Sequence, residues 1–326
     1  MPRRALVTGA TGFIGRWLAR ALIARGDAVV ATARNAAERP ELAALVPNAA
    51  WLDADILDAG TIFRAIKSAN PDVIFHLAAG TAGTLAELEA ANIGGIEAVL
   101  RAVARGAKPG GAVRVVTAGS ASEYGAVPFA SLPIREDAVP APVGDYGASK
   151  LAATRRALEL GDTLGVSVTV ARIFNVTGPG EPERLVFGRL ARAIVQAERA
   201  GAPAEVAVGS LGATRDIIDV RDVADALIAV SEMTSAESAA PPIVNVGSGV
   251  ESLVREHVAR ILALARVGVR TREPEDAAPL PPARHVADVS LLAAAGFRAR
   301  IALNASARDL LDEARAQAGE RDRNSA

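Results

Sequence analysis

The stretch Arg4-Ala5-Leu6-Val7-Thr8-Gly9-Ala10-Thr11-Gly12-Phe13-Ile14-Gly15-Arg16 is a short apolar run that breaks at three spaced glycines and then continues with helical periodicity. This order predicts a strand, a tight loop and a helix. Gly9 permits a sharp exit from the strand, Gly12 lets the backbone approach a pyrophosphate, and Gly15 lets the helix pack closely. The N–H groups of the helix N-terminus then face the phosphates. The stretch predicts a dinucleotide-binding turn, and the alternative is an ordinary glycine-rich turn.

The composition is that of a globular protein of 326 residues, half of them apolar, with a net charge of −1. This length suggests about two domains. No apolar run approaches the roughly 18 residues that a membrane span needs, and no basic patch suggests nucleic acid. The chain has no cysteine for a disulfide or a thiolate metal site, and its first strand begins close to Met1, which leaves no room for a signal peptide. We therefore expect a cytoplasmic protein without membrane or nucleic-acid partners.

Strands and helices alternate through the first half of the chain, which predicts an α/β fold with a doubly wound parallel (Rossmann) sheet. We expect a dinucleotide-binding domain over 1–172, to which 216–246 returns, and a smaller, discontinuous C-terminal substrate lobe over 173–215 and 247–318, with a frayed tail at 319–326. No internal repeat or metal cluster is evident. The expected strands are 28–32, 50–56, 73–79, 113–117 and 243–246, the expected helices are 59–68, 85–104, 183–200, 251–265 and 304–317, and 273–282 is expected to be a loop.

The end of the second expected strand bears on the choice of cofactor. In this architecture an acidic residue there binds the 2′-hydroxyl of NAD, whereas an arginine accommodates the 2′-phosphate of NADP. Arg34 stands at this position, and no acidic residue follows before Glu38. NADP(H) is therefore favoured and NAD(H) remains possible; the alternative is that Arg34 is a solvated surface charge.

Two further polar residues lie at the ends of expected strands. Asp55 could accept a hydrogen bond from an adenine amino group, or it could cap the next helix. His76 lies within an apolar run, which favours a core histidine over a catalytic one.

Tyr146 and Lys150 are spaced so that, on the helix expected to begin at Asp145, their side chains project from one face. A free phenol has a pKa of about 10, and a neighbouring cation lowers it. Lysine occurs only three times among 36 basic residues, so its presence here is notable. We expect Lys150 to lower the pKa of Tyr146. Ser120, at the end of the fifth expected strand, is placed to bind the same substrate oxygen; Ser122 competes for this role, and either serine could instead cap a turn.

These residues resemble the extended short-chain dehydrogenases/reductases that act on nucleotide sugars, and the resemblance covers nearly the whole chain. It is carried by Thr8-Gly9-Ala10-Thr11-Gly12-Phe13-Ile14-Gly15, His76-Leu77-Ala78-Ala79, Ser120 four residues before Tyr124-Gly125, Tyr146-x-x-x-Lys150, Arg172-Ile173-Phe174-Asn175-Val176-Thr177-Gly178-Pro179-Gly180 and Arg215-Asp216-Ile217-Ile218-Asp219-Val220-Arg221-Asp222-Val223-Ala224.

The resemblance implies Ser120, Tyr146 and Lys150 as catalytic residues and a homodimer formed through the helices that begin near Leu85 and Tyr146. It places Asn175 on the phosphate side of a nucleotide sugar and Arg215 on its diphosphate. The expected substrate-binding residues are Ser122, Asn175, Arg184 and Arg215. The expected cofactor-binding residues are Gly9, Thr11, Gly12, Phe13, Ile14, Gly15, Arg34, Asp55, Ile56, Leu77, Ala78, Ala79, Tyr146 and Lys150.

Among the reactions of this family we expect NADPH-dependent reduction of a keto group on a nucleotide-linked 6-deoxy sugar, because the motifs most resemble those of GDP-4-keto-6-deoxy-mannose reductases. Ile173 and the segment Gly296-Phe297-Arg298-Ala299 depart from the family pattern. The alternatives are a 4-epimerase that retains NAD, a reductase of a non-sugar ketone and a non-catalytic relative. A 4,6-dehydratase is less favoured, because Ala121 and Ser122 occupy the positions of its acid and base.

Overall fold

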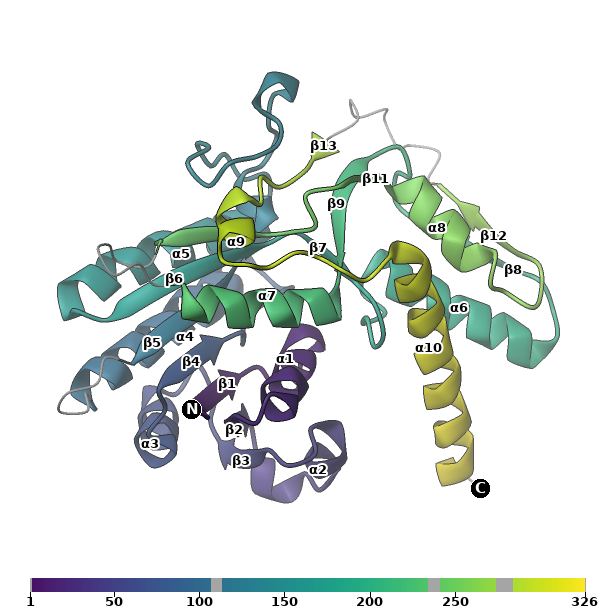
Figure 1. The fold of residues 1–326 in the computed structure, drawn as a ribbon. Coiled ribbons are helices and arrows are strands. Elements are labelled where there is room, and N and C mark those ends of the chain that lie inside the picture. The colour runs from purple at the N-terminus through teal and green to yellow at the C-terminus, as the bar shows by residue number, and fades with distance from the viewer. Residues whose placement is uncertain (1, 107–112, 234–240, 274–283, 326) are drawn as a thin grey trace.

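The structure is a computed structural model that describes residues 2–106, 113–233, 241–273 and 284–325 (Figure 1). Seven strands form a parallel sheet in the order β10-β6-β5-β4-β1-β2-β3. They are β1 Arg4–Thr8, β2 Ala28–Ala33, β3 Ala50–Asp53, β4 Val73–His76, β5 Arg114–Ser120, β6 Ser167–Ile173 and β10 Ile243–Val246. The helices that accompany this sheet are α1 Phe13–Ala24, α2 Glu41–Leu45, α3 Ala59–Ala69, α4 Leu85–Arg105, α5 Asp145–Leu164 and α7 Val220–Glu232.

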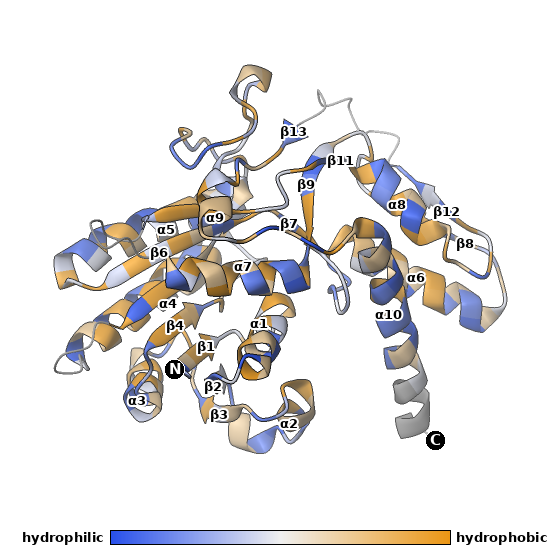
Figure 2. Ribbon diagram, viewed as in Figure 1, coloured by the Kyte–Doolittle hydropathy of each residue, from blue (hydrophilic) through white to orange (hydrophobic). Residues whose placement is uncertain are grey.

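The sheet carries a hydrophobic core on each face because successive strand residues point to opposite sides. Leu6 and Ile74 face the core formed with α3, α4 and α5, whereas Val7 and Phe75 face the core formed with α1 and α7. Figure 2 shows the apolar residues along these strands and on the inner sides of the helices. The expected doubly wound α/β fold is confirmed. Among the described residues, no helix is both long and apolar enough to cross a membrane.

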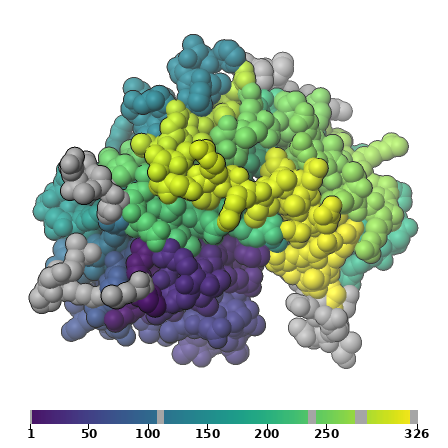
Figure 3. Space-filling view, in the orientation of Figure 1, coloured from purple at the N-terminus to yellow at the C-terminus, as the bar shows by residue number. Residues whose placement is uncertain are grey.

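The C-terminal half builds a second unit with its own core. Its strands are β7 Asn175–Thr177, β8 Ala204–Ala207, β9 Thr214–Asp219, β11 Glu251–Leu253, β12 Val269–Arg272 and β13 Arg284–His285, and its helices are α6 Val186–Ala200, α8 Val254–Leu262 and α10 Leu303–Ser325. Helix α9 Ser290–Ala294 packs instead against β10 and α7 of the large sheet. β9 lies between β11 and β13 and also pairs with β7, while β8 pairs with β12. The core lies among α6, α8 and α10. In Figure 3 the C-terminal segment, in yellow, runs across the face of the molecule from one unit to the other.

Several expected boundaries need correction. Segment 216–219 belongs to β9 in the small sheet, so the return to the large sheet begins with α7. The helix expected from Glu251 begins at Val254, because 251–253 pair with β9 as β11. The helix expected from Glu183 begins at Val186. Helix α10 continues through most of the tail that we expected to fray. The loop expected at 273–282 lies almost entirely outside the described residues.

The turn after β1 depends on two glycines. Gly9 has a φ of +71°, a conformation that L side chains rarely adopt, and leads from the strand into the loop. A Cβ atom at Gly15 would lie 2.1 Å from the carbonyl oxygen of Gly9, so α1 approaches the loop as closely as backbone allows. The expected roles of Gly9 and Gly15 in shaping this turn agree with the geometry.

Replacement of Gly15 by alanine is expected to lower the free energy of unfolding by roughly 1–3 kcal/mol, because the new methyl group overlaps the Gly9 carbonyl and forces α1 away. Denaturant unfolding checks this. Gly268→Ala is the matched control: its Cβ would lie 3.8 Å from Pro203, and a change within about 0.5 kcal/mol is expected. Equal unfolding midpoints for the two variants would contradict the close approach.

Candidate active site

The carboxyl end of the large sheet begins with the glycine turn, and its geometry fits a dinucleotide phosphate. The N-cap of α1 is Gly12, which offers no side chain, and the first helical turn contains no acidic residue. The N–H groups there therefore lie at a positive helix end whose N-cap makes no side-chain hydrogen bond. Thr11, Phe13 and Ile14 lie in this segment, as the sequence predicts, and their contacts with a cofactor remain predictions.

The end of β2 carries Arg34, the residue that bears on the choice between NADP(H) and NAD(H). Arg34 is exposed directly after the strand, as a 2′-phosphate contact requires. The alternative role of Asp55 as a helix cap is wrong, because Asp58 accepts from Gly60 N and Thr61 N at the start of α3. The Asp55 carboxylate instead accepts from Leu57 N (3.0 Å). Adenine binding by Asp55 and the role of Ile56 remain predictions.

The segment after β4 meets α5 around a small cavity. Ala78, Ala79 and Lys150 line it together with His76, and its volume of about 10 Å³ is that of a single water. The sequence-predicted residues of β4 and α5 are therefore brought together here. His76 is buried and shares a hydrogen bond with Thr8 Oγ1 (2.9 Å); burial, with the Lys150 charge, lowers its pKa to about 3. It is a neutral core histidine, as expected.

The serine turn after β5 places Ser120 against Tyr146. Ser120 begins a short 3₁₀ turn over Ala121–Glu123, and its Oγ accepts from Ser122 N (3.2 Å) and from Ser122 Oγ (2.8 Å). With both of these bonds accepted, the Ser120 hydroxyl keeps its own hydrogen to donate, and its interaction with the Tyr146 phenol lowers the pKa of that phenol. Of the two serines, Ser120 is therefore the one that acts on Tyr146, while Ser122 bonds to Ser120.

Helix α5 reaches this turn because Gly147 has no side chain. A Cβ atom there would lie 2.7 Å from Ser122 O. The contact brings the first turn of α5, and with it Tyr146, against the serine turn. The residue after the tyrosine is thus part of what positions it.

Lys150 is bonded to the main chain of β5, a contact that the sequence did not indicate. Its Nζ donates to the carbonyl of Ala118 on β5, and its side chain is almost fully buried, at 5 % exposure. Burial lowers the pKa of Lys150 to about 8, while the Glu123 charge acts in the opposite direction. A buried ammonium needs a hydrogen-bond acceptor, and the strand end provides one. Contact between Lys150 and a ribose remains a prediction.

The direction of the shift at Tyr146 also corrects our expectation. Burial raises the pKa of the phenol, and so does the charge of Glu123, while the Ser120 hydrogen bond and the charge of Arg184 lower it. The net direction is upward. The charge of Arg184 opposes this upward shift. The site therefore holds a protonated phenol at neutral pH, which suits a proton donor.

The expected substrate residues surround the same edge. Asn175 begins β7, and its Nδ2 donates to Asp216 O (3.2 Å), which ties the amide to β9. Arg215 is half-buried on β9, donates to Thr214 O (2.9 Å), and its charge contributes to lowering the pKa of His285 on the paired strand β13. Arg184 is exposed before α6. Their contacts with substrate remain predictions.

Three buried polar residues near this site were not singled out from the sequence. Asn92 on α4 accepts from Gly80 N (2.9 Å) and donates to Ser149 Oγ (3.0 Å), which in turn bonds Tyr146 O. The sequence does indicate Asn92 as a buried polar residue, since it shares the apolar face of its helix with Leu88 and Ile96. The other two, Glu123 and Arg172, form an ion pair at 2.8 Å.

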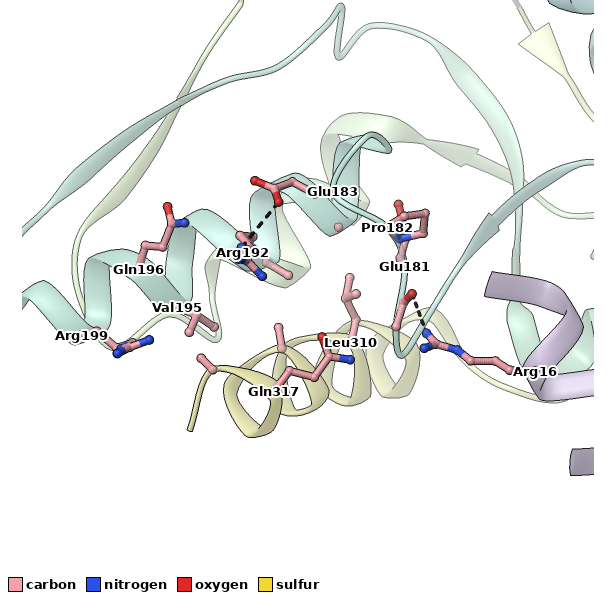
Figure 4. A pocket seen from close by; sticks show the side chains of 15 residues that line it. Arg16, Glu181, Pro182, Glu183, Arg192, Val195, Gln196, Arg199, Leu310 and Gln317 are labelled. Atoms are coloured by element: carbon pink, nitrogen blue, oxygen red, sulfur yellow. Dashed lines mark hydrogen bonds and ion pairs between the residues drawn. The ribbon is translucent and has the colours of Figure 1, made fainter. Parts of the chain in front are cut away.

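A cavity of about 300 Å³ lies elsewhere, between α6, α10 and the 180–183 loop (Figure 4). Its charged groups are already paired, for example Glu183 with Arg192 at 3.5 Å. At one end, Arg16 of α1 donates to Gly180 O (2.6 Å), and the neighbouring Trp17 donates to Pro179 O (2.9 Å). We place the chemistry at Tyr146 because that is where the reactive groups converge.

Comparisons with known proteins agree with this geometry. Residues 5–247 match the NAD dependent epimerase/dehydratase family. The chain is 36% identical over 282 residues to dTDP-6-deoxy-L-talose 4-dehydrogenase (NAD(P)(+)) of Kitasatospora kifunensis, covering 85% of this chain and 83% of that protein. It is 32% identical to GDP-6-deoxy-D-mannose reductase of Pseudomonas aeruginosa, with 82% of each covered. UDP-glucose 4-epimerases also match, one from Azospirillum brasilense at 29% over 78% of this chain and 75% of that protein.

Solved structures show the same architecture over the whole chain. RMD from Pseudomonas aeruginosa complexed with NADPH superposes with a TM-score of 0.79 at 27% identity, over 97% of this chain and 99% of that one. A putative epimerase from Burkholderia cenocepacia gives a TM-score of 0.82 at 30% identity over the same shares. The chain thus belongs to the NAD dependent epimerase/dehydratase family, the NAD(P)-dependent extended short-chain dehydrogenases/reductases that the sequence motifs resemble.

Proposed function

We propose that this enzyme uses NADPH to reduce a keto group on a nucleotide-linked 6-deoxy sugar. The observation that carries the proposal is the convergence of Ser120, which ends β5, and a protonated Tyr146, in the first turn of α5, at the carboxyl edge of the sheet. A keto group that gains hydride at carbon needs a proton at oxygen, and a neutral phenol supplies it. The two relatives with the highest identities described above are a dehydrogenase and a reductase of nucleotide-linked deoxysugars.

The residues divide the work as follows. A bound nicotinamide cofactor supplies the hydride. Ser120 holds the substrate oxygen through its hydroxyl, Tyr146 transfers its proton to that oxygen as negative charge develops, and the product is the alcohol. Lys150, anchored to Ala118, is placed to bind the nicotinamide ribose. Arg184 is the cation that stabilises the phenolate left behind.

The nucleotide end of the substrate is assigned to the small sheet. We infer that Arg215 binds the diphosphate, because a guanidinium matches phosphate oxygens with two parallel N–H donors. Asn175 keeps its amide oxygen for a ligand, since its Nδ2 is used to bond Asp216. We also expect a cytoplasmic homodimer formed through α4 and α5.

The competing reactions are supported less well. Dehydration needs an acid and a base near the sugar ring, and the carboxylate nearest in sequence, Glu123, is buried against Arg172. Epimerisation remains the second candidate because UDP-glucose 4-epimerases are among the relatives. It uses the same tyrosine, so the discriminating property is whether cofactor is consumed.

Tyr146→Phe is expected to lower kcat at least about 100-fold, because the proton donor is lost, while NADPH still binds. The measurement is NADPH absorbance with a panel of 4-keto-6-deoxy sugar nucleotides, with cofactor binding followed separately by NADPH fluorescence. An epimerase would interconvert its sugar nucleotides without net oxidation of NADPH. Unchanged turnover in Tyr146→Phe would overturn the assignment of the proton donor.

Arg215→Ala should weaken the binding of sugar nucleotides but not of a non-sugar ketone.

The two serines should differ in effect. Ser120→Ala is expected to reduce kcat about 100-fold, because it removes the hydroxyl that bonds Tyr146. Ser122→Ala should cost about tenfold or less, since the Ser122 hydroxyl is used to bond Ser120. Steady-state kinetics of both variants provide the check. If Ser122→Ala were the more damaging, the assignment of the two serines would be reversed.

Arg34 should set the preference for the phosphorylated cofactor. Arg34→Ala is expected to raise KM for NADPH roughly 10- to 100-fold, since one charged hydrogen bond to phosphate is worth about 1.5–3 kcal/mol, and to leave KM for NADH nearly unchanged. Arg39→Ala is a suitable control, because Arg39 lies five residues further along and pairs with Glu41. Equal losses with NADH and NADPH would assign Arg34 to the protein surface.

A further inference from the structure

A buried carboxylate, that of Glu123, contacts the main chain of Ser120. Glu123 closes the 3₁₀ turn that begins at Ser120, and its side chain is fully buried. Its Oε1 accepts from Ser120 N at 2.8 Å. The main chain of the serine that adjoins Tyr146 is therefore held by this carboxylate.

Arg172 holds the other oxygen of the same carboxylate. It lies on β6 in register with Gly119 of β5, and its Nε donates to Glu123 Oε2 at 2.8 Å. The guanidinium is only 2 % exposed and lies 4.6 Å above the Tyr124 ring. Gly119 makes room for the pair, because a Cβ there would lie 2.8 Å from Glu123 Oε1. Both carboxylate oxygens are thus fixed by partners on neighbouring strands.

The charge of Glu123 extends to both catalytic groups. It raises the pKa of the Tyr146 phenol and acts in the same direction on Lys150, against the effect of burial. Burial in a medium of low dielectric strengthens such effects. The other charged or titratable groups around these three are Arg172 against Glu123, Arg184 acting on Tyr146, Glu136 acting on Tyr124, and the neutral His76 beside Lys150.

We propose that Glu123, clamped by Arg172, is a positioning residue of the active site: it fixes the main chain of Ser120 beside Tyr146 and brings a buried negative charge to the catalytic residues. The carboxylate takes no part in proton transfer. Its catalytic relevance rests on the proposed function, but its effect on Tyr146 does not, and the test therefore needs no substrate.

The chain contains only two tyrosines, which makes the phenol of Tyr146 directly observable. Phenolate absorbance is titrated against pH in the whole protein and in Tyr146→Phe, and the difference is the titration of Tyr146. In Glu123→Gln the same difference is expected to move to lower pH by about one unit, because the neighbouring negative charge is gone. The alkaline limb of kcat should move with it.

A charged control separates the two parts of the proposal. Glu123→Asp keeps the charge but shortens the reach to Ser120 N, so the titration should stay near that of the unsubstituted protein while kcat falls about tenfold. Glu123→Gln leaves Arg172 buried without its carboxylate, which could prevent folding. Glu123→Gln with Arg172→Met removes both charges and should show a smaller move in the same direction, because the offsetting positive charge of Arg172 is lost as well.

The outcome that overturns the proposal is a Tyr146 titration that stays in place in both Gln-containing variants while their stability falls; the pair would then be structural only. A Tyr146 titration that moves, in a protein that reduces no sugar nucleotide, would support the role of Glu123 and contradict the proposed function instead.

Discussion

The parallel pairing of β1, β4, β5 and β6 is the constraint on which this site depends. Because all four strands run in the same direction, their carboxyl ends meet at one edge of the sheet. The glycine turn follows β1, Ala78 and Ala79 follow β4, and Ser120 ends β5. Helix α5 then packs beside β5 and β6 and brings Tyr146 and Lys150 to that edge. The parallel direction of the strands therefore brings the segments that carry the site residues together at one edge of the sheet.

Burial determines how the polar groups at this edge behave. Lys150 satisfies its ammonium with a strand carbonyl, Glu123 pairs with Arg172, and Asn92 joins the loop after β4 to α5. Each of these groups would be costly if left without a partner in the protein interior. The same partners fix the positions of the backbone and side chains around Tyr146. The hydrogen bonds that satisfy the buried polar groups therefore also preorganise the site.

Local patterns predicted much of this from the sequence. The glycine turn, the alternating strands and the Tyr146 to Lys150 spacing are read within a few residues, and the structure places them as expected. The missing parts depend on partners far away in the chain. Lys150 turns to Ala118 and Glu123 pairs with Arg172, 49 residues later. Strands of two or three residues, such as β7 and β13, are defined only by pairing with β9 and have no pattern of their own.

The contact between α1 and the loop after β7 has a mechanical consequence. Arg16 and Trp17 hold the carbonyls of Gly180 and Pro179, and Arg16 also lies 3.7 Å from Glu313 of α10. Helix α1, which begins at the glycine turn, is thus hydrogen-bonded to the loop that follows β7. A movement of α1 away from this loop therefore has to break both hydrogen bonds and the ion pair of Arg16 with Glu313.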